Sequence, residues 1–181
     1  LHEVGMDGGG INPLREFALR RSLSRVMGEI RPDAVLCYNP KPVAWGPPAA
    51  RRAGARRVVA MITGLGYAFT GSGVKRRIVR RALLRLYRRS LRQCDVVFVQ
   101  NEDDRAVLRE AGCLGAPDRS RLLPGSGVDL ERFRTAPLPG RTSFLMVARL
   151  LGDKGVREYV EACRALHRTH PDVETVLLGG P

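Results

Sequence analysis

Short apolar runs bounded by turn residues alternate with segments of helical periodicity, and this alternation limits the possible folds more than any other feature of the chain. Four apolar runs have the length of buried strands, at 34–38, 57–62, 95–99 and 121–123. Apolar residues recur at helical spacing in 12–30, 43–52, 74–92 and 102–111. Strands that alternate with helices predict an α/β fold with a parallel sheet covered on both faces. We expect the helix at 43–52 to be interrupted at Pro47 and Pro48.

A change of composition near 135–140 predicts a domain boundary. This stretch contains Pro137, Pro139 and Gly140 and is typical of an interdomain turn. Beyond it the pattern predicts a strand at 143–148, a helix at 155–167 and a strand at 173–178. We therefore expect a partial first domain at 1–138 and the truncated beginning of a second domain at 139–181.

The charge and the rarer side chains leave several interpretations open. The net charge of +13 is compatible with binding to nucleic acid, an anionic membrane or phosphorylated ligands. Only Lys41, Lys75 and Lys154 are lysines among 31 basic residues, however, and a GC-rich genome produces the same arginine excess by codon bias. The cysteines have no CxxC spacing and the histidines have no third ligand, which predicts buried free thiols and no metal site. Without a signal peptide or a spanning apolar run, the expected location is cytoplasmic.

The segment from Val74 to Arg92 combines an apolar stripe with a strongly basic face. The stripe comprises Ile78, Val79, Ala82, Leu83, Leu86, Tyr87 and Leu91. We expect this stripe to pack on the sheet. The basic face has two interpretations: a solvated surface, or peripheral contact with an anionic membrane, which would be the inner face of the plasma membrane.

The segment 144–156 is the strongest candidate for chemistry. Arg149 follows a predicted strand, and Lys154 directly precedes the next predicted helix. Phosphates bind where a strand leads into a helix N-terminus, and arginine can hold a phosphate through two parallel hydrogen bonds. Cations fixed there would stabilise the charge that develops on a departing diphosphate. The alternative is an ordinary strand–turn–helix with two solvated cations.

Three motifs resemble those of the retaining glycosyltransferases of family 4. The segment from Ala148 to Gly155 is similar to the donor-site motif G-R-L…K-G, with Ala148 in place of the first glycine. The segment from Pro124 to Phe133 is similar to the loop P-N-G-V-D…F that closes the N-terminal domain. The segment from Ile62 to Phe69 resembles a subset of these enzymes that build capsules, O-antigens or other polyprenyl-linked glycans.

The resemblance implies a GT-B fold, in which an N-terminal Rossmann-like domain binds the acceptor and a C-terminal one binds a nucleotide-sugar. It implies a hexosyl- or N-acetylhexosaminyltransferase that retains anomeric configuration and uses no cofactor or metal. The implied donor is a UDP-sugar, and the implied acceptor is linked to polyprenyl diphosphate. Arg149 and Lys154 would be the catalytic, diphosphate-binding residues. The candidate cleft loops contain Thr63, Gly64, Gly66, Gly125 and Gly127, where glycine allows close approach of the backbone to a ligand.

Departures from the family pattern limit which residue roles the resemblance implies for this chain. Many members have a histidine after the strand that here ends at Ile62, whereas this chain has Thr63 and Gly64. The paired glutamates E-x7-E of the family would lie beyond Pro181, so we expect the 181-residue chain alone to be inactive. The alternatives are an inactive fragment or a basic module that binds membrane or nucleic acid. Nucleic acid is not expected, because Tyr87 is the only aromatic residue in the basic helix.

Overall fold

The computed structural model describes residues 2, 4–5, 13–66, 69, 73–138 and 140–180. The first residue of the helix predicted at 12–30 and part of the loop after Ile62 lie outside the described residues. The chain forms two compact units, Leu1–Gly127 and Val128–Pro181. Residues 128–138 contain no helix or strand, and the domain boundary at 138 stays a prediction.

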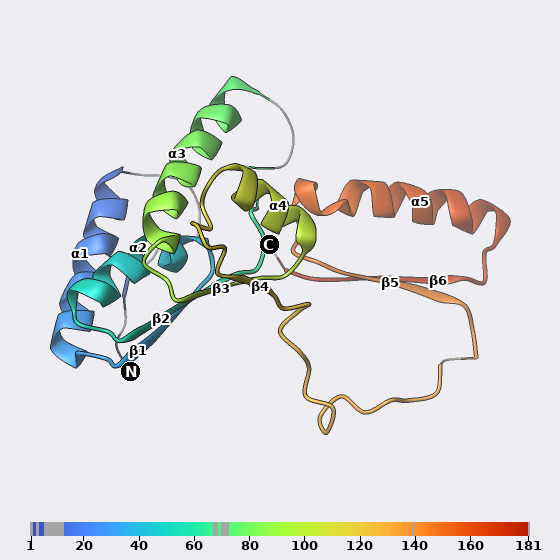
Figure 1. Cartoon of the computed structure of the whole chain (residues 1–181). Helices are drawn as coiled ribbons and strands as arrows, with labels where there is room; N and C mark the ends of the chain where they lie inside the picture. The colour runs from blue at the N-terminus through green and yellow to red at the C-terminus, as the bar shows by residue number, and fades with distance from the viewer. Residues whose placement is uncertain are drawn as a thin grey trace. The chain divides into compact units, whose positions relative to one another are not determined.

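The first unit is built on a parallel sheet of four strands, β1 (Ala34–Tyr38), β2 (Arg57–Ile62), β3 (Val96–Val99) and β4 (Ser120–Leu122). Their order in the sheet is β1-β2-β3-β4 (Figure 1). In the register, Tyr38 pairs with Met61 and Met61 pairs with Phe98. The expected α/β class with a parallel sheet is confirmed.

Helices cover one face of this sheet. They are α1 (Pro13–Ile30), α2 (Pro40–Arg52), α3 (Val74–Leu91) and α4 (Glu102–Glu110). Because neighbouring strands are also consecutive in sequence, right-handed crossovers place α2, α3 and α4 on the same side. The core lies between these helices and the inward side chains of the strands, and α1 packs on α2. Its fully buried members include Val43, Val58, Tyr87, Val97 and Leu108.

The opposite face of the sheet is uncovered among the described residues, so the expectation of helices on both faces was wrong for this part of the chain. Leu36 is 60% exposed and Tyr38 is 43% exposed. The residues that pair with them across β2 and β3 are only partly buried, namely Val59, Met61 and Phe98. The physical reason is the strand order, which sends every crossover to the same side.

The apolar stripe of α3 is buried over only half of its length, which corrects the prediction that all of it packs on the sheet. Tyr87 and Leu91 are buried, whereas Ile78 is 63% exposed and Ala82 is also exposed. Figure 1 shows the N-terminal half of α3 extending away from the strands. Those apolar side chains therefore have no sheet to pack against.

Helix α2 is continuous through its prolines, although an interruption was expected there. It begins at Pro40, where proline is tolerated because the first helical amide has no partner within the helix. Pro47 cannot donate the amide hydrogen that the carbonyl group of Val43 would normally accept. Ser90 of α3 donates its hydroxyl hydrogen to that carbonyl group instead. A side chain from the neighbouring helix thus replaces the missing bond.

The second unit contains β5 (Ser143–Val147), the 3-10 helix η1 (Gly152–Lys154), α5 (Val156–Thr169) and β6 (Glu174–Leu178). The strands β5 and β6 are parallel and pair from Ser143↔Glu174 to Val147↔Leu178. The hydroxyl group of Tyr159 on α5 lies 3.0 Å from the carbonyl oxygens of both Phe144 and Val176, and so fastens the helix to both strands. Within the described part of the whole chain, no helix is long and apolar enough to cross a bilayer.

Candidate functional site

The backbone of Arg149 is fixed at the carboxyl end of β5. On one side of it, the Ala148 amide donates to Leu178 O at 3.1 Å. On the other side, the Leu150 amide donates to Gly180 O at 3.0 Å. The pairing of β5 with β6 therefore continues past both strands, and the Arg149 side chain projects from this held segment into solvent.

Gly179 makes this close pairing possible. A Cβ atom added at Gly179 would lie 1.8 Å from the carbonyl oxygen of Ala148, closer than any two such atoms can approach. By contrast, a Cβ atom at Gly180 would have nothing within 4 Å. The site therefore requires a small residue directly after β6, at Gly179, as well as in the motif around Arg149.

Lys154 lies at the entrance to α5. It is the last residue of η1, and Gly155 follows with φ 76° and ψ 19°, a left-handed conformation that turns the chain into the helix. The first bond across this entrance runs from the Tyr159 amide to Gly155 O at 2.9 Å. The amides of residues 156–158 precede it and, as in the first turn of any helix, have no intrahelical acceptor.

Arg149 and Lys154 are both exposed, and within the described residues neither forms an ion pair or a side-chain hydrogen bond. Two cations without anionic partners therefore lie on either side of a turn that leads into a helix N-terminus. Such an arrangement favours a phosphate group, which accepts hydrogen bonds from guanidinium, ammonium and backbone amides alike. The structure contains the strand–turn–helix that the sequence predicted around these residues, and their catalytic role stays a prediction.

In the first unit, a side-chain hydrogen bond joins the loops after β1 and β2. The hydroxyl group of Thr63 donates to Oδ1 of Asn39 at 3.3 Å. Asn39 has φ 74° and ψ 161°, an unfavourable conformation for a non-glycine residue. Gly64 and Gly66 continue the loop with φ 153° and 69°. The candidate cleft residues after β2 are therefore held to the end of β1.

A second side-chain hydrogen bond joins the loops after β3 and β4. Nε2 of Gln100 donates to the hydroxyl oxygen of Ser126 at 3.1 Å. Ser126 lies between Gly125 and Gly127, which have φ 79° and 80°. The carboxyl edge of the sheet, where ligands bind in open α/β folds, thus contains all five candidate cleft residues of this unit.

Asn39 and Gln100 were missing from the candidate residues predicted from the sequence. Each follows directly after a strand, at the edge where parallel sheets bind ligands. That position is the signal that could have identified them. The bonds that they form with Thr63 and Ser126 depend on the side-by-side arrangement of strands, which no single segment encodes.

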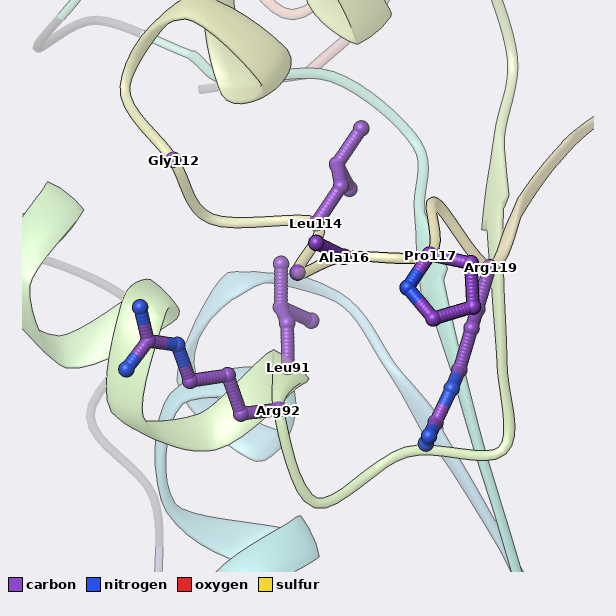
Figure 2. A pocket seen from close by; sticks show the side chains of 8 residues that line it. Leu91, Arg92, Gly112, Leu114, Ala116, Pro117 and Arg119 are labelled. Atoms are coloured by element: carbon purple, nitrogen blue, oxygen red, sulfur yellow. The ribbon is translucent and has the colours of Figure 1, made fainter.

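A cavity lies at the opposite edge of the sheet, where the strands begin. Its volume is about 500 Å³, and its lining includes Arg92, Leu114 and Arg119, which precede β3 or β4 (Figure 2). One cation of this lining is already engaged, because Nη1 of Arg119 donates to Cys94 O at 3.1 Å. The cavity contains none of the candidate cleft residues, so we do not place the transfer site there.

The thiols of the first unit are suited to packing rather than to nucleophilic chemistry. Cys37, Cys94 and Cys113 are buried and free, as predicted. Cys163 in the second unit is also free but only partly buried, so the prediction of burial was wrong for this thiol. Burial raises the pKa of both Cys37 and Cys94 to about 12, so neither forms a thiolate at neutral pH. Among the described residues, no cluster of three or more His, Cys, Asp or Glu side chains could hold a metal ion.

Comparison with known proteins identifies the family. Residues 7–132 match the family described as Glycosyltransferase Family 4. The chain belongs to this glycosyltransferase family. The match covers most of the first unit and confirms the expected GT-B type of Rossmann-like fold. Arg149 and Lys154 lie outside the matched residues.

A curated relative of this chain comes from Mycolicibacterium smegmatis (strain ATCC 700084 / mc(2)155). It is named GDP-mannose-dependent alpha-(1-6)-phosphatidylinositol monomannoside mannosyltransferase and is 29% identical. The alignment covers 92% of this chain and 44% of the relative. The chain therefore spans less than half the length of this relative.

Proposed function

We propose that the protein is a glycosyltransferase that moves a sugar from a nucleotide-sugar to a polyprenyl-linked acceptor in bacterial envelope polysaccharide synthesis. Transfer with retention of anomeric configuration is part of this proposal. The observation that supports it best is family membership together with two cations, Arg149 and Lys154, that lie beside the entrance to α5 and have no anionic partner among the described residues. The hexosyl or N-acetylhexosaminyl nature of the sugar is also proposed from the sequence resemblance.

In the proposed reaction, the bond between the anomeric carbon and the donor diphosphate breaks and leaves negative charge on the phosphate oxygens. Arg149 would hold two of these oxygens through its guanidinium group, and Lys154 would add a second positive charge. The exposed amides at the start of α5 would donate further hydrogen bonds. These groups are arranged before the bond breaks, so they lower the barrier without reorganisation of solvent. No cofactor or metal is part of the proposal.

The nucleotide of the donor can be tested directly. The sequence resemblance predicts a UDP-sugar, whereas the mycobacterial relative is named for GDP-mannose. A shared diphosphate explains why Arg149 and Lys154 suit either nucleotide. We therefore propose assays in which release of UDP and of GDP is measured in parallel.

Peripheral contact with an anionic membrane is the second part of the proposal. Many arginines of α3 are exposed, including Arg77, Arg81 and Arg85, and a lipid-linked acceptor would be presented at a membrane surface. The name of the relative likewise includes a lipid, phosphatidylinositol monomannoside. Co-sedimentation with anionic liposomes at low salt tests this contact, and failure to bind would exclude it.

The test of sugar transfer uses the complete protein, meaning this chain with any sequence that adjoins it in its source. Arg149→Ala should lower kcat by about 10²- to 10³-fold, the effect of removing one group that stabilises transition-state charge. Lys154→Ala should act in the same direction. Arg168→Ala, which removes an exposed cation from the other end of α5, is the matched control and should retain activity.

Wild-type turnover in Arg149→Ala would contradict the assigned role. Absence of donor turnover in the complete wild-type protein would instead favour the alternatives of an inactive remnant or a basic binding module. The 181-residue chain alone is expected to release no nucleotide from any donor.

A further inference from the structure

A narrow furrow runs between helices on the outer side of the first unit, and we call it the helix furrow. It consists of two adjoining cavities, of about 100 and about 20 Å³, which share Ala44, Trp45 and Leu86. Trp45 and Leu86 are partly buried against the hydrophobic core. The floor of the helix furrow is therefore apolar, and its small volume suits a ligand that lies along the surface rather than one that is enclosed.

Three arginines from three different helices line one end of the helix furrow. Arg20 belongs to α1, Arg52 ends α2, and Arg89 lies in the last turn of α3. The residues that line this end include no Asp or Glu. Within the described part of the chain, none of the three guanidinium groups forms an ion pair or a hydrogen bond. Positive charges gathered in this way repel one another until an anion binds.

The other end of the helix furrow is electrically balanced. Nζ of Lys41 lies 2.9 Å from a carboxylate oxygen of Glu16. Nε1 of Trp45 donates to the same carboxylate at 2.7 Å. The indole group is thereby fixed, and the unbalanced positive charge is confined to the end with Arg20, Arg52 and Arg89.

The apolar floor extends beyond the cavities along α3. Ala82 and Leu83 line the larger cavity, and Ile78 lies one turn from Ala82 on the same helix face. Ile78 is 63% exposed and Val74, one further turn away, is 72% exposed. An apolar path therefore leads from the three arginines to an exposed apolar helix end.

We propose that the helix furrow binds a phospholipid, with the phosphate on Arg20, Arg52 and Arg89 and an acyl chain along Trp45, Leu86 and Leu83. Guanidinium groups match phosphate oxygens geometrically, and the apolar floor matches an acyl chain. The inference deepens the proposed membrane contact and rests on it. It requires no sugar donor, acceptor or transfer, because the helix furrow contains none of the candidate residues of the transfer site.

Trp45 provides a direct measurement, because it is the single tryptophan of the chain. The 181-residue chain is titrated with dihexanoyl phosphatidic acid at concentrations below micelle formation. Tryptophan emission should shift to shorter wavelength and saturate, since the acyl chain replaces water at the indole ring. Dihexanoyl phosphatidylcholine and glycerol 3-phosphate should each bind at least about tenfold more weakly. In the first, the choline cation offsets the charge of the single phosphodiester anion and would be repelled by the three arginines, and the second has no acyl chain.

Charge-matched variants separate a site from general attraction to a basic protein. Arg20→Gln, Arg52→Gln and Arg89→Gln combined should weaken binding of dihexanoyl phosphatidic acid by about tenfold or more. The control combines Arg21→Gln, Arg164→Gln and Arg168→Gln, which removes the same charge from exposed positions outside both the helix furrow and α3. This control should bind within about twofold of wild type. The single variant Arg89→Gln, expected to weaken binding in the same direction, replaces the combined variant if the latter does not fold.

Three results would overturn the inference: no saturable change in Trp45 emission, equal weakening in the two combined variants, or equal affinity for glycerol 3-phosphate. Binding of the chain to anionic liposomes shows whether only the phospholipid site is wrong or whether the proposed membrane contact is wrong as well. If liposomes bind but the helix furrow variants bind them as wild type does, the helix furrow is wrong and the contact stands. If the chain ignores anionic liposomes and the short-chain lipid, both are wrong.

Discussion

The hydroxyl group of Ser90 donates a hydrogen bond to the main-chain carbonyl oxygen of Val43, across the interface between α3 and α2. Pro47 occupies the position whose amide would otherwise bond that carbonyl group. Ser90 and Val43 are both fully buried, so water does not serve as a substitute. This contact replaces the hydrogen bond that Pro47 removes from the interior of α2.

Ser90→Ala should therefore lower the free energy of unfolding by about 1–3 kcal/mol, because a buried carbonyl group loses its donor. Adding Pro47→Ala to this variant should recover part of the loss, since alanine restores the amide. Urea denaturation of the 181-residue chain measures both effects.

Tyr87→Phe is the matched control for Ser90→Ala. Tyr87 is equally buried on the same helix, but among the described residues its hydroxyl group has no hydrogen-bond partner. Removing it should change the free energy of unfolding by less than about 0.5 kcal/mol or increase it. Equal stability of Ser90→Ala and wild type would show that the bond to Val43 contributes nothing.

The order and type of the elements could be predicted from the sequence, because each apolar run and each helical pattern is local. The strand at 34–38 and the one at 57–62 have the predicted bounds, and the other elements differ by a few residues. The sequence also predicted that Thr63, Gly64 and Gly66 lie at the carboxyl edge of the sheet, because parallel strands end at one edge.

What was missed depends on contacts between distant segments. The stripe of α3 has uniform helical spacing, yet Ile78 has no sheet beneath it while Tyr87 has. The prolines of α2 predict a break unless Ser90 is known to lie beside Val43. Likewise, no local pattern shows that Asn39 reaches Thr63.

Gly179→Ala is expected to disturb the segment that carries Arg149. The added Cβ would lie 1.8 Å from Ala148 O, so the pairing between 148–150 and 178–180 would have to open. Overpacking of this kind costs about 1–3 kcal/mol. In the complete protein we expect weaker binding of UDP or GDP, measured by calorimetry.

Gly180→Ala is the control for this substitution, because a Cβ atom there meets nothing within 4 Å. It should bind nucleotide as wild type does. If Gly179→Ala and Gly180→Ala bind equally well, the close approach of Gly179 to Ala148 does not position Arg149.

Asp95 should make the stability of the first unit depend on pH. Its carboxylate accepts a hydrogen bond from the Val58 amide at 2.7 Å and lies 2.9 Å from Nη2 of Arg51. The hydrogen bond from the Val58 amide contributes most to lowering the pKa of Asp95 below its ordinary value of 3.8, and Arg51 lowers this pKa further. The folded state therefore binds fewer protons than the unfolded state just below this value. The stabilisation is complete above about pH 5 and is lost as the pH falls through 3.8 and then through the lower pKa of the folded state.

Urea denaturation of the 181-residue chain between pH 6 and pH 3 tests this expectation. Asp95→Asn should destabilise the chain at pH 6 by about 1–3 kcal/mol, because an amide forms weaker hydrogen bonds with Val58 and Arg51 than a carboxylate does. The difference from wild type should then shrink as the pH falls, since protonation removes the same charge from Asp95. Asp33→Asn is the control, because Asp33 is exposed and its oxygen lies 3.9 Å from Nε of Arg56. A constant difference between wild type and Asp95→Asn across this range would show that ionisation of Asp95 does not stabilise the fold.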